Sequence, residues 1–410
     1  MADWKMIEGG VCAAQGFAAG GIHVGVKSHN TEKKDIALIV SEQKCAAAAV
    51  YTTNAVKAAH IHVDQAHLAN GIARAAFVNS GNANACAPNG EQHAKNICAA
   101  VAKAAGCAED DVIIAATGVI GQEINEKVIT DGIPALYASC AATAAGSDAC
   151  AHAIMTTDTV KKELALETVI GGKTVHIGGV TKGSGMIHPN MGTLLCFVTT
   201  DCAISPAMIH EALLETVKVS FNRISVDGDT STNDTFCVMA NGMAGNAEIA
   251  EKGEDYAAFV AALKALCVKL AMAMASDGEG ANHLITCTVT GAKSEASAET
   301  LSKAVISSTL TKAAIFGADA NWGRVLCAMG YSGEQFDPDK VDVAFESAAG
   351  SIAVCAAGRG LPFDEDLAKK ILTEHDVVIR IAMGEGEGEC TCWGCDITYE
   401  YIKINGDYRT

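Results

Sequence analysis

The chain is poor in proline, in aromatic residues and in basic residues. Among 410 residues there are 6 prolines, aromatic side chains make up 5%, and 30 basic residues stand against 48 acidic ones, for a net charge of −18. With 50% apolar residues and little proline, the composition is typical of a compact globular protein rather than a disordered one. An acidic chain without a lysine or arginine cluster lacks the positive field that binds phosphate backbones, so we expect no nucleic-acid partner.

Long apolar runs are also missing. The sequence has no stretch of 18 consecutive apolar residues, and its first ten residues, MADWKMIEGG, contain neither the basic region nor the apolar core of a signal peptide. We therefore expect a cytoplasmic protein without a membrane partner. The length predicts two or three structural units with a full hydrophobic core.

Cysteine is abundant, with 17 residues, but most are scattered through apolar segments without the framework of a disulfide-rich domain. This usage is typical of a reduced, cytosolic protein. Cys390, Cys392 and Cys395 have the spacing of a metal or redox site, yet no second cysteine pair and no histidine lies nearby in the sequence. We expect structural thiols and no metal, with a zinc site as the alternative.

Apolar patterns along the chain change between strand-like and helix-like periods. Strands are predicted at 36–51, 75–78, 110–116, 194–199, 224–227, 235–240, 284–290, 341–345, 377–381 and 397–404. Helices are predicted at 91–105 before Gly106, at 206–219 after the N-cap Ser205, and around 259–270. Because strands and helices interleave without a strict βαβ rhythm, the predicted fold class is α+β, with layered mixed or antiparallel sheets and helices.

Thr193 follows a glycine-rich segment and opens an apolar, strand-like run. Sheet propensity alone would place a β-branched residue there. However, Pro189 lacks a backbone donor and Gly192 permits unusual backbone angles, which suits a strained peptide bond held against the threonine hydroxyl. Cleavage between Gly192 and Thr193 would give Thr193 a free α-amine, with a pKa of about 7.7 to 8.0, beside its own hydroxyl. Thr193 would then be a nucleophile that carries its own base.

An acyl intermediate on Thr193 would need hydrogen-bond donors for its oxyanion. Thr117 and Gly118, at the end of the predicted strand 110–116, offer a hydroxyl and a backbone N–H. An ordinary strand-to-helix turn is the alternative interpretation of this segment. The glycine-rich strings at 183–185 and 384–388 lack dinucleotide-binding or P-loop spacing, so we expect no nucleotide cofactor.

Six separated segments, in order, give the chain a resemblance to a known family. They are ATGVIG at 116–121, KGSGMIHPNMGT at 182–193, SVDGDTSTNDT at 225–235, DGEGA at 277–281, NWGR at 321–324, and the C-terminal stretch 393–410 with WGCD and INGDYRT. Together they strongly resemble the ArgJ family, the glutamate N-acetyltransferases or ornithine acetyltransferases of the cyclic arginine pathway. The resemblance extends from about residue 8 to the last residue.

The resemblance implies an autoprocessed fold of the ArgJ and DmpA type, cut into an α chain, 1–192, and a β chain, 193–410. It makes Thr193 the nucleophile, with Thr117 and Gly118 as oxyanion donors. The amino-acid pocket it implies consists of Thr156, Lys182, Thr193, Glu279, Asn405 and Thr410. Lys182 suits a substrate carboxylate, and Glu279 suits the free ammonium group of ornithine.

The same resemblance implies the reaction and its partners. The acetyl group would pass from N²-acetylornithine to Thr193 and then to glutamate, and acetyl-CoA is a possible second donor. The two chains would assemble as a heterotetramer of two α and two β chains. Three departures from the usual family pattern concern Asn282 and His283 after Ala281, Ala320 in the segment DANW, and Gly192 where alanine is common.

Two other functions stay open at this point. An autoprocessed aminopeptidase or amidase would share the scaffold but let water resolve the acyl-enzyme. A noncatalytic protein would use the pocket only to bind an amino-acid effector. The destination of a labelled acetyl group separates the three, since it goes to glutamate, to free acetate, or nowhere.

Overall fold

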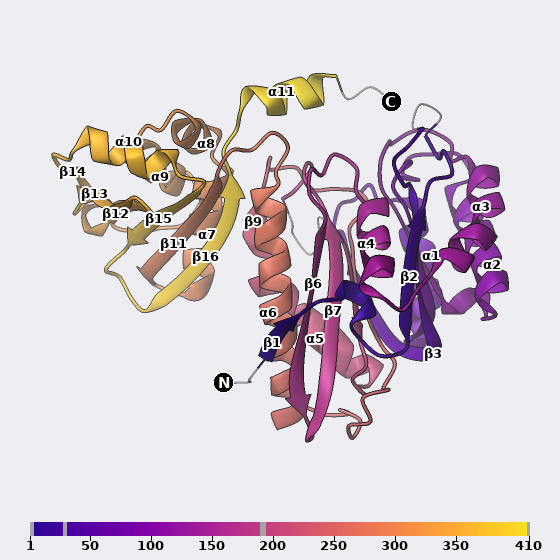
Figure 1. The fold of residues 1–410 in the computed structure, drawn as a ribbon. Coiled ribbons are helices and arrows are strands. Elements are labelled where there is room, and N and C mark those ends of the chain that lie inside the picture. The colour runs from indigo at the N-terminus through magenta and orange to yellow at the C-terminus, as the bar shows by residue number, and fades with distance from the viewer. Residues whose placement is uncertain (1–3, 28–30, 189–193, 408–410) are drawn as a thin grey trace. The chain divides into compact units, whose positions relative to one another are not determined.

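The computed structural model describes residues 4–27, 31–188 and 194–407, which form two compact units. Unit 1 contains residues 1–183, 189–222 and 230–271, and unit 2 contains residues 184–188, 223–229 and 272–410. Both units combine sheets with helices (Figure 1), which confirms the α+β class, and two units agree with the number expected from length. Each unit is described by itself below.

Unit 1 contains a mixed sheet that has nine strands within the described residues, in the order β1-β6-β7-β8-β10-β3-β4-β5, with β2 also paired to β3. Its strands are β1 (Trp4–Ile7), β2 (Phe17–Ile22), β3 (Ile36–Tyr51), β4 (Ile72–Asn79), β5 (Val112–Ala116), β6 (Lys162–Ile170), β7 (Lys173–Lys182), β8 (Leu195–Thr200) and β10 (Thr235–Ala240). The pairs β8–β10 and β4–β5 are parallel, and the other pairs are antiparallel.

Helices cover both faces of this sheet. They are α1 (Ala59–His67), α2 (Gly90–Ala105), α3 (Glu126–Ser139), α4 (Ala144–Ala153), α5 (Pro206–Val219) and the unit 1 part of α6 (Glu254–Ser276). Because successive side chains of a strand point to opposite faces, Phe77 belongs to the buried cluster that contains Ile97 of α2, while Val78 belongs to the cluster that contains Cys150 of α4. In Figure 1, α2 and α3 lie side by side on one flank of the sheet.

The α6 helix is the one helix within the described residues that is long and apolar enough to cross a membrane by length and composition, and half of its most apolar stretch is buried inside the protein. Phe259, Leu263, Leu266 and Leu270 are fully buried. A Cβ atom at Gly179 of β7 would lie 3.1 Å from Leu270 and 3.4 Å from Leu266, so glycine lets the helix approach the sheet closely. Packing in the core of unit 1 therefore accounts for the apolar face of α6.

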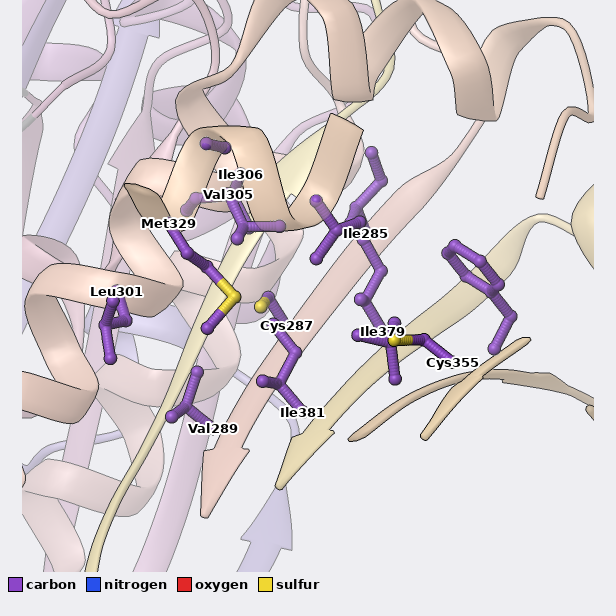
Figure 2. Close-up of a cluster of buried hydrophobic side chains, with 14 of the residues drawn as sticks. Ile285, Cys287, Val289, Leu301, Val305, Ile306, Met329, Cys355, Ile379 and Ile381 are labelled. Atoms are coloured by element: carbon purple, nitrogen blue, oxygen red, sulfur yellow. The ribbon is translucent and has the colours of Figure 1, made fainter. Parts of the chain in front are cut away.

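Unit 2 contains a second mixed sheet, with seven strands within the described residues, in the order β14-β13-β12-β15-β11-β16-β9. Its strands are β9 (Ile224–Ser225), β11 (Leu284–Ala292), β12 (Asp342–Ser347), β13 (Gly350–Ala356), β14 (Arg359–Gly360), β15 (Asp376–Ala382) and β16 (Gly388–Cys395). Its other helices are α7 (Glu295–Ser307), α8 (Thr309–Phe316), α9 (Trp322–Gly330), α10 (Glu365–Thr373) and α11 (Tyr399–Gly406). Figure 2 shows the core, where Cys287 and Val289 of β11 lie near Met329 of α9.

Most predicted elements are confirmed within one or two residues at their ends. Gly106 ends α2 with a φ of +65°, and the hydroxyl of Ser205 accepts the N–H of Met208 at the start of α5. The strand predicted at 110–116 begins only at Val112, after a short 3₁₀ turn, and the one predicted at 224–227 ends at Ser225.

The strand predicted at 397–404 is wrong, because this segment forms helix α11. The hydroxyl of Thr398 accepts the N–H of Tyr401 and caps the helix. Tyr399 and Ile402 suggested a strand, but their side chains are 81% and 62% exposed. Without a sheet surface to bury them, the aromatic and β-branched side chains do not decide the conformation.

Truncation of Leu266 tests the packing of α6. Leu266→Ala should reduce the free energy of unfolding by about 3 kcal/mol, because it leaves a cavity in a fully buried face. Leu310→Ala is the matched control, since this leucine is 56% exposed and its loss should change stability by less than about 0.5 kcal/mol. Urea unfolding of both variants measures the difference, and equal effects would contradict the described packing.

Candidate active site

Thr117 and Gly118 form a sharp turn directly after β5. The backbone N–H of Thr117 donates to the carbonyl of Asn79 at 2.9 Å. Gly118 has a φ of +127°, and a Cβ atom there would lie 2.7 Å from the carbonyl carbon of Gly81. Backbone angle and lack of space therefore both require glycine at 118. The predicted turn is present, and its role as an oxyanion site stays a prediction.

The structure brings Lys182 to this turn. Lys182 ends β7, is 8% exposed, and donates from its Nζ to the Oγ1 atom of Thr117 at 3.1 Å. Because the hydroxyl oxygen accepts from the ammonium group, the proton of the hydroxyl is directed elsewhere and can be donated to a ligand. A neighbouring positive charge also makes this hydroxyl a stronger donor.

Asp158 links the end of β7 to Thr156. One oxygen of its carboxylate accepts from Lys162 Nζ at 2.7 Å and from the N–H of Gly183 at 2.8 Å, while the other accepts from the N–H of Thr156 at 3.1 Å. Burial would raise the pKa of Asp158, but the charges of Lys162 and Lys182 and these hydrogen bonds hold that pKa below its ordinary value. Asp158 is therefore a buried anion that fixes the segments carrying Thr156 and Lys182.

Thr156 borders a cavity of about 370 Å³ in unit 1 that is rich in lysine. Lys27, Lys33 and Lys34 line it, with Thr31, Glu32, Asp35, Ser80, Gly81 and Met155 as the other lining residues. Burial lowers the pKa of Lys27, and the charges of Lys182 and Lys33 lower it further. The three lysines outnumber the two carboxylates of the lining, Glu32 and Asp35, so this cavity is locally positive in a chain with a net charge of −18.

Glu279 and Asn405 come together in unit 2. The Nδ2 atom of Asn405, in α11, donates to Oε2 of Glu279 at 2.7 Å. Glu279 is 8% exposed, and its own N–H donates to the carbonyl of Ser184. A Cβ atom at Gly185 would lie 2.4 Å from the Glu279 carboxyl group, so the second glycine of the 182–185 segment gives that carboxylate its space.

The remaining predicted site residues are outside the described part of the chain. These are Gly192 and Thr193, which flank the predicted cleavage point, and Thr410 at the C-terminus. Thr117, Gly118, Thr156 and Lys182 belong to unit 1, whereas Glu279 and Asn405 belong to unit 2. In unit 1, hydrogen bonds join Lys182 to Thr117 and, through Asp158, join the end of β7 to Thr156. In unit 2, a hydrogen bond joins Asn405 to Glu279.

The three C-terminal cysteines divide between two environments. Cys390 and Cys392 are both buried on β16, and their sulfur atoms lie 4.0 Å apart. The sulfur of Cys395 lies 3.7 Å from Nζ of Lys312, which also donates to the Cys395 carbonyl. Within the described residues no group of three histidine, cysteine or acidic side chains is arranged to hold a metal ion.

Two residues near the turn were missed by sequence reasoning. Asn233 donates from Nδ2 to the carbonyls of Ala83 and Ala116, at 2.5 and 2.8 Å, and so holds the residue that precedes Thr117. Asp158, described above, is the other. Both were visible as polar residues, Asn233 inside the TNDT motif and Asp158 two residues after Thr156, but only folding shows what they contact.

The chain belongs to the ArgJ family, whose model matches residues 18–410. It is 48% identical over 409 residues to the arginine biosynthesis bifunctional protein ArgJ of Symbiobacterium thermophilum, covering 100% of both chains. It is 46% identical over 407 residues to the protein of the same name from Caldanaerobacter subterraneus, covering 99% of this chain and 100% of that one. A solved structure of the Bacillus halodurans protein is 43% identical and covers 51% of this chain and 97% of that one, with a TM-score of 0.49.

The pH dependence of stability tests the Asp158 ion cluster. A carboxylate whose pKa is depressed by folding stabilises the folded state above the ordinary aspartate pKa of about 3.9, and this contribution disappears as the pH falls through the folded value. Asp158→Asn should therefore lower the free energy of unfolding by about 3 kcal/mol at pH 7. The difference in this free energy between the variant and the wild type should become smaller below pH 4.

Asp148→Asn is the control for this measurement. Asp148 pairs with Lys161 at the surface, so its loss should change stability at pH 7 by less than about 1 kcal/mol. Urea unfolding at pH 7 and at pH 3.5 measures the difference in free energy of unfolding between each variant and the wild type. If the difference for Asp158→Asn stays constant or grows in acid, the lowered pKa assigned to Asp158 would be contradicted.

Proposed function

We propose that this chain transfers the acetyl group of N²-acetyl-L-ornithine to L-glutamate, giving L-ornithine and N-acetyl-L-glutamate, in cytoplasmic arginine biosynthesis. The observation that carries the proposal is the family match over residues 18–410, with near-complete coverage of relatives named for arginine biosynthesis. Because those relatives are named bifunctional, acetyl-CoA is the second donor in our scheme, so that the enzyme also acetylates glutamate directly.

The active form in this scheme is cut between Gly192 and Thr193. Support comes from the sheet of unit 1, in which β7, before the cut, pairs over 177–182 with β8, after it, including Lys182 with Leu195. The same sheet joins β10 from the second chain to β3 from the first. A single cut leaves these hydrogen bonds intact, so the α and β chains stay together, and two of each form the heterotetramer.

The reaction runs in two halves through Thr193. Its α-amine takes the hydroxyl proton as Oγ1 attacks the acetyl carbonyl, and the hydroxyl of Thr117 and the N–H of Gly118 donate to the oxyanion. The C–N bond then breaks, the proton passes from the Thr193 amine to the leaving nitrogen, and ornithine departs. Glutamate attacks the acetyl-threonine by the reverse steps. No cofactor or metal takes part.

The other predicted residues bind the amino-acid portion of the substrates. Lys182 donates to the hydroxyl of Thr117, and its positive charge suits a substrate carboxylate. Thr156 lies beside the lysine-rich cavity, which suits the second carboxylate of glutamate. Glu279, held by Asn405, suits the ammonium group of ornithine. Thr410 completes this set in the proposal.

Removal of the Thr117 hydroxyl tests the oxyanion assignment. Thr117→Ala should lower kcat by about a hundredfold, because one oxyanion donor contributes about 3 kcal/mol. Thr117→Ser keeps the hydroxyl and should retain most of the activity. Thr130→Ala is the control, since that hydroxyl bonds only within its own helix α3 among the contacts described. Equal turnover of the Thr117→Ala and Thr130→Ala enzymes would contradict the role.

Thr193→Ala tests both processing and chemistry. Denaturing mass spectrometry should find a single chain of 42.1 kDa for the variant and two chains for the wild type. After incubation with acetylornithine, only the wild-type fragment that begins at Thr193 should gain one acetyl group. Labelled acetyl should then move to glutamate, whereas its release as free acetate would favour the amidase alternative. An uncut wild-type chain with full activity would overturn the scheme.

A further inference from the structure

The segment that carries Glu279 is a tight turn between α6 and β11, residues 277–283, tied to other parts of unit 2. The hydroxyl of Ser184 donates to the carbonyl of Asp277 at 2.6 Å, and the N–H of Glu279 donates back to the carbonyl of Ser184 at 2.9 Å. The hydroxyl of Thr398 donates to the carbonyl of Gly280 at 2.7 Å. Hydrogen bonds thus hold the middle of this Glu279 turn on both sides of the carboxylate.

Asp396 holds the other end of the turn. One oxygen of its carboxylate accepts the N–H groups of Asn282, at 2.8 Å, and His283, at 3.1 Å. The other oxygen lies 2.8 Å from Nδ1 of the His283 imidazole. The side chain of Asp396 has no exposed surface, and a buried carboxylate requires such partners to offset its loss of hydration. All of the contacts described for this carboxylate are with the turn.

Asp396 also stands where the chain enters α11. It directly follows β16, and two residues later Thr398 caps the helix that carries Asn405. Gly280, with a φ of +68°, packs against the first turn of this helix, where a Cβ atom at 280 would lie 2.7 Å from Cβ of Glu400. The turn and the helix are thus fixed to each other at residues just after Asp396 in the chain.

These contacts form a closed ring. Asp396 binds the backbone at 282 and 283, that backbone continues the turn from Glu279, and the Glu279 carboxylate accepts from Asn405 at 2.7 Å. The α11 helix then returns from Asn405 to Thr398, two residues from Asp396. Loss of the Asp396 carboxylate removes the hydrogen bonds that join the residues before α11 to the turn that carries Glu279.

We propose that Asp396, with His283 as its partner, is a positioning residue that holds the Glu279 carboxylate and the Asn405 amide in the geometry needed to bind the substrate amine. This proposal rests on the substrate-binding role of Glu279 in the proposed function. It also gives a role to His283, one of the two departures after Ala281, because its imidazole contacts the buried Asp396 carboxylate rather than the substrate.

A double-mutant cycle of Glu279→Gln and Asp396→Asn tests the proposal, with KM and kcat measured for N²-acetylornithine at saturating glutamate. Each single variant should raise KM by about tenfold, because it weakens a charge-assisted hydrogen bond to the substrate amine, directly in Glu279→Gln and through lost orientation in Asp396→Asn. The value of kcat should stay within about threefold of the wild type, because neither side chain takes part in the acetyl transfer itself. The double variant should raise KM no further than Glu279→Gln alone, because Asp396 acts through Glu279.

Further variants separate positioning from general stability. Asp364→Asn removes another unit 2 carboxylate that accepts two backbone N–H groups, those of Asp366 and Leu367, and its kinetics should match the wild type. Thr398→Val removes the hydroxyl that donates to Gly280 and caps α11, so it should raise KM by loosening both the turn and the helix that carries Asn405. If Asp396→Asn fails to fold, His283→Gln decides the question, because it removes the imidazole that lies 2.8 Å from the Asp396 carboxylate and should also raise KM with kcat little changed.

Each outcome bears on a distinct claim. A normal KM for Asp396→Asn beside a raised KM for Glu279→Gln would overturn the positioning role and leave the proposed function intact. The positioning role also fails if the two effects on KM multiply in the double variant, or if kcat falls while KM is unchanged. A normal KM for Glu279→Gln would overturn the substrate role of Glu279, and the positioning role with it.

Discussion

A carboxylate removed from water must be stabilised by charges and hydrogen bonds, and the buried carboxylate of Asp158 in unit 1 has this requirement. Its buried oxygens accept from Lys162, from the backbone of Gly183 and from the backbone of Thr156, and the charge of Lys182 acts on it as well. Because Gly183 is 25 residues from Asp158 in the chain, the carboxylate can be satisfied only when β7 ends beside Thr156. The contact of Lys182 with Thr117 depends on that placement.

In unit 2, too, a buried carboxylate bonded to the backbone orients residues that we assign to substrate binding. There the buried carboxylate of Asp396 accepts two backbone N–H groups of the turn that presents Glu279, and the following helix presents Asn405. In both units a polar residue that we assign to substrate binding is oriented by a buried anion bonded to nearby backbone. Backbone N–H groups suit this purpose, since they are donors whose positions are set by the fold rather than by a rotamer.

Conversion of one precursor into two chains is compatible with this architecture because the sheet of unit 1 takes strands from both sides of the Gly192–Thr193 bond. The antiparallel pair β7–β8 and the neighbouring strands β10 and β3 are joined by backbone hydrogen bonds and share a buried core. A cut outside these strands removes a covalent link without removing the contacts. The two compact units also each contain residues from both sides of the bond.

The amino-acid sequence by itself determined the family, the α+β class and most elements, because apolar periodicity, caps such as Ser205 and glycines such as Gly106 act over a few residues. It also indicated Thr117, Gly118, Lys182, Glu279 and Asn405 through their motifs. Only the tertiary structure decided that 397–404 contains a helix, because no sheet surface buries Tyr399 or Ile402. It also decided the partners of Lys182, Asp158 and Asp396, since hydrogen bonds between residues 65 or 113 positions apart leave no periodic signal in a sequence.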